Sequence, residues 1–199
     1  MGGMVVRRGG PADFGSAVEV WRAANEARLG GRASPPTVQL ERLHAALRVP
    51  NAFLFVADDG DISGMAVGMQ GLADDGAGPP IGDLCHVGAV FVAPERWGAG
   101  LGGELVEAVL FEARSRGYGR AQLWTHADNP RAQRLYEGRG FRRSGREKQD
   151  DLGETIVYLE RDLWTPARHP GRTRRPATST RGGSREQERV ARVARDEQG

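Results

Sequence analysis

One glycine-rich stretch, Ala93 to Gly103, constrains the fold of this chain more than any other feature. It reads APERWGAGLGG, with Gly98, Gly100 and Gly102 at alternate positions. It follows an apolar, β-branched segment, Leu84 to Val92, and precedes a segment with apolar residues at helical spacing. Such glycines let the backbone approach a ligand closely, and the helix start offers unpaired N–H groups and a positive dipole end. The pattern favours a pyrophosphate site, although a turn without a ligand fits an isolated motif of this kind equally well.

Two other nucleotide-binding motifs do not fit this stretch. A Walker loop ends in Gly-Lys-Ser/Thr, whereas Glu104 follows Gly103. A Rossmann fingerprint opens the first βαβ unit of its domain, whereas this stretch comes after an expected antiparallel hairpin that turns at Asp59 and Gly60. The site is therefore expected to be of a different kind.

Hydrophobic periodicity predicts the element order β-α-α-β-β-β-α-β-α-β-β. Turn-forming residues from Gly71 to Gly82 predict a loop there. The expected strands span residues 4–8, 52–57, 62–70, 84–92, 121–125, about 141–147 and 155–160, and the expected helices begin near Pro11, Thr37, Leu101 and Pro130.

Composition limits the number of domains and the classes of protein that this chain can belong to. The 199 residues are 39% hydrophobic and 27% charged, which fits one globular domain with some unstructured length. No apolar run reaches the length of a membrane helix or of a secretory signal, so we expect a cytoplasmic protein without membrane contact. The single cysteine, Cys85, has no partner for a disulfide or for a cysteine metal site.

The last part of the chain differs from the rest. Residues 165–199 contain nine arginines and four acidic residues and are rich in Pro, Gly, Ser and Thr. This composition predicts a disordered tail after a domain spanning residues 1–164. A tail of this charge suits an acidic partner, but it has no aromatic residues to stack on bases, so we do not expect nucleic-acid binding.

A second motif, Asn129 to Phe141, reads NPRAQRLYEGRGF. With the first stretch it gives V-x-P-E-x-x-G-x-G-x-G followed by N-x-x-A-x-x-x-Y-x-x-x-G-F. In this order the two motifs resemble the GCN5-related N-acetyltransferases (GNAT), and the resemblance covers roughly Met4 to Leu163. It implies a mixed α/β fold with a mostly antiparallel, splayed sheet of about seven strands flanked by four helices.

The resemblance also implies acetyl-CoA as co-substrate and no metal. Backbone N–H groups of the loop would bind the pyrophosphate, and the end of the preceding strand would pair with the pantetheine arm like an added strand. Asn129 would contact the arm or simply cap the helix that follows. The implied cofactor-binding residues are Val90, Phe91, Val92, Gly98, Ala99, Gly100, Leu101, Gly102 and Asn129.

Two positions depart from the family pattern. Trp97 stands where relatives usually carry Gln or Arg, and Ala99 stands where Arg or Lys is common. Both departures remove side-chain contacts but keep the backbone donors. Arg96 or Arg131 could supply the missing charge.

Catalysis needs a proton donor for the leaving thiolate and a proton acceptor for the attacking amine. The resemblance makes Tyr136 the donor, and a tyrosine packed in the core is the alternative. For the acceptor we favour His86, on the strand before the glycine loop, because an imidazole accepts a proton at neutral pH. A satisfied structural histidine is the alternative there, and Asp83 and His126 are other candidates.

The resulting hypothesis is acetyl transfer from acetyl-CoA to a primary amine of a small molecule or peptide, by direct attack through a tetrahedral intermediate. A GNAT-like sensor of acyl-CoA without turnover is the alternative from another class. The acceptor itself is set by segments with little readable structure, namely Arg28 to Pro36, Gly71 to Gly82 and the turn near Asp150, and it stays open. The family suggests a homodimer, but the oligomeric state stays open as well.

Overall fold

The computed structural model describes residues 3–30, 37–150 and 152–163. The tail expected from residue 165 onward lies outside the described residues, so its predicted disorder and the domain boundary before it stay predictions. No helix in the described part of the chain is long and apolar enough to cross a membrane.

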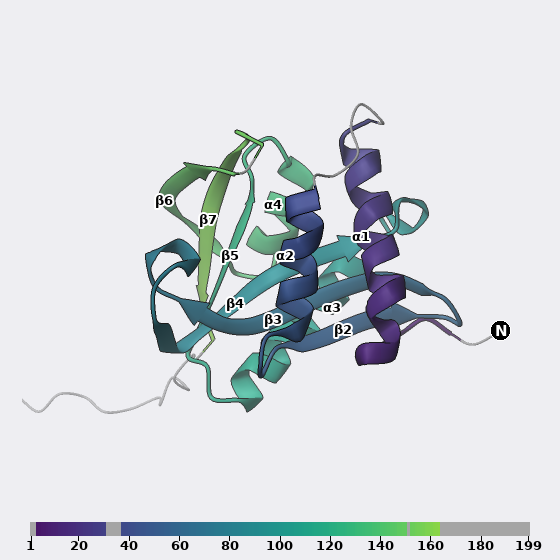
Figure 1. Ribbon diagram of the computed structural model, residues 1–199, viewed down its shortest axis with the longest axis horizontal. Coiled ribbons are helices and arrows are strands. Elements are labelled where there is room, and N and C mark those ends of the chain that lie inside the picture. The colour runs from purple at the N-terminus through teal and green to yellow at the C-terminus, as the bar shows by residue number, and fades with distance from the viewer. Residues whose placement is uncertain (1–2, 31–36, 151, 164–199) are drawn as a thin grey trace, which may run out of the picture. The chain divides into compact units, whose positions relative to one another are not determined.

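The helices and strands follow one another in the order that the sequence predicts (Figure 1). They are β1 (Val5–Arg8), α1 (Phe14–Arg28), α2 (Thr37–Arg48), β2 (Phe53–Asp58), β3 (Ile62–Leu72), β4 (Pro80–Val92), α3 (Leu101–Ser115), β5 (Arg120–His126), α4 (Pro130–Glu137), β6 (Arg142–Gln149) and β7 (Thr155–Asp162).

The strands form one seven-stranded sheet in the order β1-β2-β3-β4-β5-β7-β6. Among the described strands only β4 and β5 run parallel, and every other neighbouring pair is antiparallel. The predicted mixed α/β fold with seven strands and four helices is confirmed.

The helices cover both faces of the sheet. Alternate residues of β2 point to opposite faces, so that Phe53 joins a core cluster with α3 whereas Leu54 joins a cluster with α1 and α2. In Figure 1, α1 and α2 lie in front of the strands and α3 lies behind them. Tyr136 of α4 belongs to the same core cluster as α3, which places the inward side of α4 on that face.

The sheet opens between its two parallel strands. Strand β4 pairs with β5 at only three positions, the last of which joins His86 to Gln122, although β4 continues to Val92 and β5 to His126. On its other side β4 stays paired with β3 up to Val92. The edge of β4 that faces β5 therefore has no strand partner from Val87 onward, and the predicted splay is present.

The loop predicted from Gly71 to Gly82 was too long. Strand β3 continues to Leu72 and β4 already begins at Pro80, which is the register partner of Leu72. Proline is tolerated as the first residue of a strand because its missing N–H removes no needed ladder bond there. The turn formers thus shape only residues 73–79.

Candidate functional site

A groove of about 670 Å³ lies where the parallel strands separate. Its walls come from the last turn of α1, the end of β4, the glycine loop with the start of α3, and the loop and first turns of α4. Of the predicted cofactor-binding residues, the groove brings together Val90, Phe91, Val92, Gly98, Gly100, Leu101, Gly102 and Asn129.

The glycine loop points free backbone donors into this groove. Within the described residues, the N–H groups of Gly98, Gly100, Leu101 and Gly102 make no hydrogen bond. Gly100 is the residue before α3 and has φ +87°, a left-handed conformation that favours glycine. Ala99 differs, because its N–H donates to Arg96 O at 3.3 Å and the residue does not line the groove. Four donors at a helix N-terminus form an anion site.

The open edge of β4 also faces the groove. Ala93 N–H donates to Ser63 O on the β3 side, so the carbonyl of the same peptide unit, Val92 C=O, points toward the gap. The indole Nε1–H of Trp97 donates to this carbonyl at 2.7 Å. The guanidinium of Arg131 lies 4.6 Å from the centre of the Trp97 ring. Trp97, which departs from the family pattern, therefore caps one end of the open strand edge.

The groove wall is strongly basic. It contains one acidic residue, Asp128, and five arginines, of which Arg28 and Arg96 are neutralised by ion pairs with Glu154 and Asp59. The other three arginines are Arg131, Arg134 and Arg139, and none of them makes an ion pair within the described part of the chain. This surplus of positive charge suits a ligand with several phosphates.

Asn129 caps α4, because its Oδ1 accepts the N–H of Ala132 at 3.0 Å, and it also lines the groove. We expect Asn129→Ala to lower the free energy of unfolding by about 1 kcal/mol through loss of the cap, whereas Asn129→Ser keeps a capping oxygen and changes it little. Urea unfolding measures this difference. If the amide also binds the cofactor, both variants weaken acetyl-CoA binding equally in calorimetry. Equal stability of the two variants would contradict the capping role.

The two predicted catalytic residues do not line the groove itself. Tyr136 lies in α4 between two lining residues, Ala132 and Arg139, and its ring packs edge-on against Phe141 with the centroids 5.9 Å apart. Burial raises the pKa of Tyr136, so its hydroxyl keeps its proton at neutral pH. His86 is the last β4 residue paired with β5, at the closed end of the gap, and burial lowers its pKa to about 4.

Sequence reasoning missed most of one wall of the groove and placed Arg28 only in a segment expected to set the acceptor. The last turn of α1 contributes Ala24, Asn25, Ala27 and Arg28, although its residues read only as the continuation of an amphipathic helix. A signal was available in Arg28, a long cationic side chain at the point where the helix pattern ends. Its partner Glu154 is 126 positions away, and no spacing rule links them.

Comparison with known proteins agrees with this geometry. Residues 18–141 match the model of the acetyltransferase (GNAT) family. Two curated relatives are mycothiol acetyltransferases: that of Thermobispora bispora is 45% identical over 69 residues, covering 35% of this chain and 22% of the relative, and that of Acidothermus cellulolyticus is 29% identical over 150 residues, covering 69% and 45%. The chain thus spans less than half the length of either relative.

Solved structures share the fold. A ribosomal-protein-alanine N-acetyltransferase from Brucella melitensis has a TM-score of 0.63 and 22% identity, covering 79% of this chain and 99% of that one. An acetyltransferase of Salmonella typhimurium solved with acetyl-CoA has a TM-score of 0.62 and 20% identity, covering 87% and 99%. The family model spans more than half of the chain and includes both sequence motifs. The chain therefore belongs to the acetyltransferase (GNAT) family.

Proposed function

We propose that the protein transfers the acetyl group of acetyl-CoA to a primary amine of a small molecule or peptide. The observation that supports this most directly is the unpaired edge of β4, whose residues 90–92 line the same groove as the free N–H groups of the glycine loop. A strand edge satisfies an extended amide chain, and a helix N-terminus satisfies a diphosphate. Acetyl-CoA joins these two chemical groups in one molecule.

The residues fit such a co-substrate. Gly98, Gly100, Leu101 and Gly102 would hold the diphosphate, and Val90 and Val92 would bond the pantetheine amides. The unpaired arginines of the groove would add charge for the phosphates. The bound thioester supplies an activated acetyl group. The Trp97 indole already donates to Val92 C=O, so a pantetheine amide would use the second lone pair of this carbonyl or displace the indole.

Tyr136 is the proposed proton donor for the leaving thiolate. Its hydroxyl retains its proton at neutral pH because burial raises the pKa. A thiol becomes a better leaving group when a proton reaches the sulfur as the C–S bond breaks. Ala132, one helical turn before Tyr136 and on the groove wall, is a small residue that leaves room beside the ring.

Cys85 supports direct transfer, without an acetylated cysteine on the enzyme. It is the one cysteine of the chain, is fully buried in β4, and burial raises its pKa from 9.0 to about 12. We expect iodoacetamide at pH 8 to alkylate the folded protein roughly 10³-fold more slowly than the urea-unfolded protein, because only the thiolate reacts. Mass spectrometry over time measures both rates. Equal rates would show an accessible, reactive thiol.

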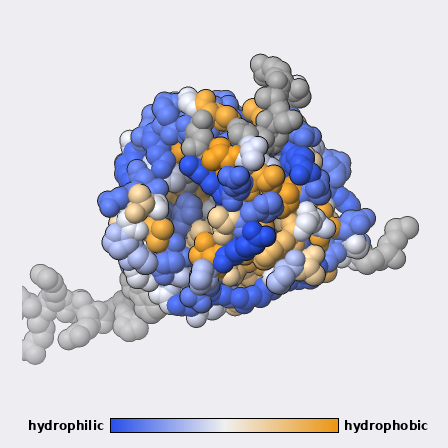
Figure 2. Space-filling model, viewed as in Figure 1, coloured by the Kyte–Doolittle hydropathy of each residue, from blue (hydrophilic) through white to orange (hydrophobic). Residues whose placement is uncertain are grey.

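The acceptor would approach from the α1/α2 side of the sheet. On this side Trp124 packs against Tyr158 with ring centroids 5.1 Å apart, and the Lys148 ammonium lies 4.5 Å from the Trp124 ring centre. Figure 2 shows hydrophobic and hydrophilic residues intermingled on this side. One structural neighbour is named a ribosomal-protein-alanine N-acetyltransferase, so a peptide amine belongs among the acceptors to be tested.

The test combines binding and turnover. The protein is incubated with acetyl-CoA and a panel of amines comprising an alanine-initiated peptide, a lysine-containing peptide with a blocked N-terminus, glycinamide and spermidine, with thiol release as the readout. We expect acetyl-CoA to bind in calorimetry and at least one amine to be acetylated. Binding without any turnover would favour the acyl-CoA sensor, and absence of binding would overturn both functions.

A further inference from the structure

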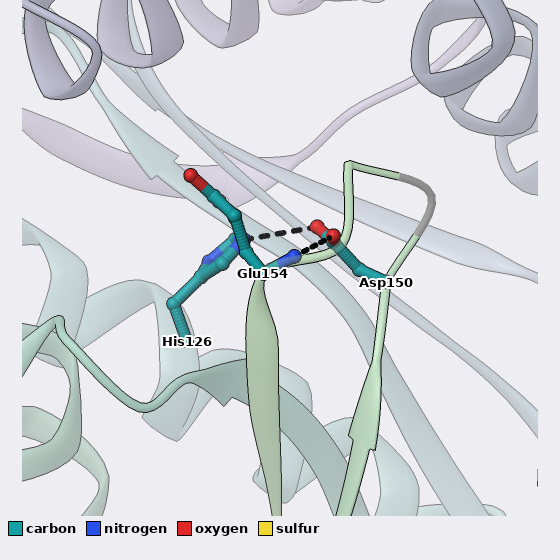
Figure 3. Close-up of side chains that lie close together, drawn as sticks. All are labelled: His126, Asp150 and Glu154. Atoms are coloured by element: carbon teal, nitrogen blue, oxygen red, sulfur yellow. Dashed lines mark hydrogen bonds and ion pairs between the residues drawn. The ribbon is translucent and has the colours of Figure 1, made fainter.

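A histidine and two carboxylates meet where β5 ends (Figure 3). His126 is the last residue of β5, and Asp150 and Glu154 lie on either side of the β6–β7 turn. The Nε2 atom of His126 lies 3.3 Å from Asp150 Oδ2 and 3.1 Å from Glu154 Oε2. Both carboxylates therefore lie close to one ring nitrogen, which is hydrogen-bonded to Asp150.

The contact between Nε2 and the carboxylates determines which nitrogen of the His126 ring is free to accept a proton. An ionised carboxylate only accepts hydrogen bonds, so Nε2 carries the hydrogen and Nδ1 of the neutral ring keeps its lone pair. Nδ1 makes no hydrogen bond to the residues that the structure describes. We propose that His126 accepts the proton of the attacking amine at Nδ1, while Asp150 and Glu154 hold and stabilise the ring through Nε2. This inference rests on the proposed function and names the base of that reaction.

Backbone hydrogen bonds hold the Asp150 carboxylate in place. Oδ1 of Asp150 accepts the N–H groups of Leu152 at 2.8 Å and of Glu154 at 2.9 Å. Burial acts to raise the pKa of Asp150, but these N–H donors and His126 together hold it below its usual value, so the carboxylate is ionised at neutral pH. The His126 ring is thus oriented by the Asp150 carboxylate, which is itself held by two backbone N–H groups.

None of the three side chains in this cluster lines the groove itself, but contacts on the α1 side connect the cluster to residues that do. Arg28, on the groove wall, donates to Glu154 Oε2 at 2.9 Å. Asp128, two residues beyond His126, also lines the groove. Tyr136 belongs to the core cluster on the opposite, α3 side of the sheet. The acceptor and the donor of protons therefore lie on opposite faces of the gap.

This division suits the proposed reaction. The amine nitrogen forms a bond to the acetyl carbon to give a tetrahedral intermediate, and the C–S bond then breaks. The amine loses one proton, to Nδ1 of His126, and the departing thiolate gains one, from the Tyr136 hydroxyl. Solvent then returns both side chains to their starting protonation states, so that atoms and charges balance.

His86, the base favoured from sequence, lies in an environment that disfavours a positive charge on its ring. A general base must be stable as its cation, yet burial and then the charge of Lys148 lower the pKa of His86 to about 4. Its Nδ1 is buried and has no hydrogen-bond partner among residues 3–30, 37–150 and 152–163. Among the described residues, four charged groups surround the His126 ring. Asp150 and Glu154 lie next to it, and Arg28 pairs with Glu154. Lys148 of β6 is separated from it by Ile156 of β7. Two anions contact the ring directly, whereas neither cation does.

The same three side chains offer ligand atoms within 4.8 Å of one another, which also suits a divalent cation. Arg28 argues for the base instead, because its guanidinium already binds the Glu154 oxygen that contacts His126. The two lone pairs of Asp150 Oδ1 are engaged by the turn. The test below separates the two roles.

The experiment compares His126→Gln, His86→Gln and the matched control His44→Gln, a histidine of α2 outside the groove. The kcat/KM of wild type and variants is measured from pH 5.5 to 9 with the fastest amine of the panel. The wild-type to variant ratio is then plotted, because ionisation of the amine cancels in it. For His126→Gln we expect a ratio on the order of 10²–10⁴ at high pH and a smaller ratio at low pH, because a general base contributes only in its unprotonated form.

Binding and stability measurements complete the test. The acetyl-CoA Kd and the Tm of His126→Gln should match wild type, and the His44→Gln ratio should stay near one at every pH. A pH-independent ratio for His126→Gln, or a pH-dependent one for His86→Gln, overturns the inference while the proposed function stands. Loss of wild-type activity in EDTA with recovery on adding zinc assigns the cluster to a metal instead. A wild type that acetylates no amine overturns both.

Discussion

Replacing Tyr136 with phenylalanine is expected to lower kcat on the order of 10²- to 10³-fold while leaving the acetyl-CoA Kd unchanged. Only the hydroxyl is removed, and the proton that we propose it donates to the thiolate must then come from water. The ring keeps its edge-on packing against Phe141, so the core is preserved. Steady-state kinetics with thiol release, together with calorimetry, separate the two quantities.

A second tyrosine provides the control. Tyr118 donates to Gln70 Oε1 at 3.3 Å and does not line the groove. Tyr118→Phe therefore removes one hydroxyl without touching the reaction, and its kcat should stay within a few-fold of wild type. If Tyr136→Phe keeps the wild-type kcat, Tyr136 is a packing residue and another group protonates the thiolate.

Replacing Gly100 with valine is expected to weaken acetyl-CoA binding on the order of 10²-fold. The left-handed backbone at Gly100, with φ +87°, costs a residue with a Cβ roughly 1–2 kcal/mol. Relaxation of that strain turns the first N–H groups of α3 away from the diphosphate, and each lost hydrogen bond to a charged group costs about 1.5–3 kcal/mol. Calorimetry with CoA and with acetyl-CoA measures the change.

Gly82→Val is the matched control for this substitution. Gly82 lies in β4, where a Cβ would meet open space and φ is not in the left-handed region. A β-branched residue suits a strand, so affinity should be unchanged. If Gly100→Val binds acetyl-CoA as wild type does, the loop is only a connection between β4 and α3.

The order of the elements was predictable because each one depends on local pattern. The apolar spacing of α3 and the short apolar run of β2 are local features of the sequence, and both elements were assigned correctly. The end of β3 was not, because the pairing of Leu72 with Pro80 depends on a neighbouring strand and outweighs the turn preference of the segment. Tertiary contact decides such boundaries.

Only part of the site could be predicted from the sequence, because the rest depends on contacts between distant segments. The glycine loop and the start of α4 are continuous motifs, so their residues could be named in advance. The wall from α1 and the partners of His126 come together through the β5-β7-β6 strand order, which brings the β6–β7 turn to the end of β5. Arg28 and Glu154 meet only in three dimensions.

The open edge of β4 has a further consequence for how the protein behaves in solution. A strand with free backbone groups along one side is a template on which a strand of another molecule can form. Here the exposed run is short, from Val87 to Val92, and the Trp97 indole covers its last carbonyl. Whatever fills the gap also shields this edge, so ligand-free preparations should self-associate more readily than saturated ones.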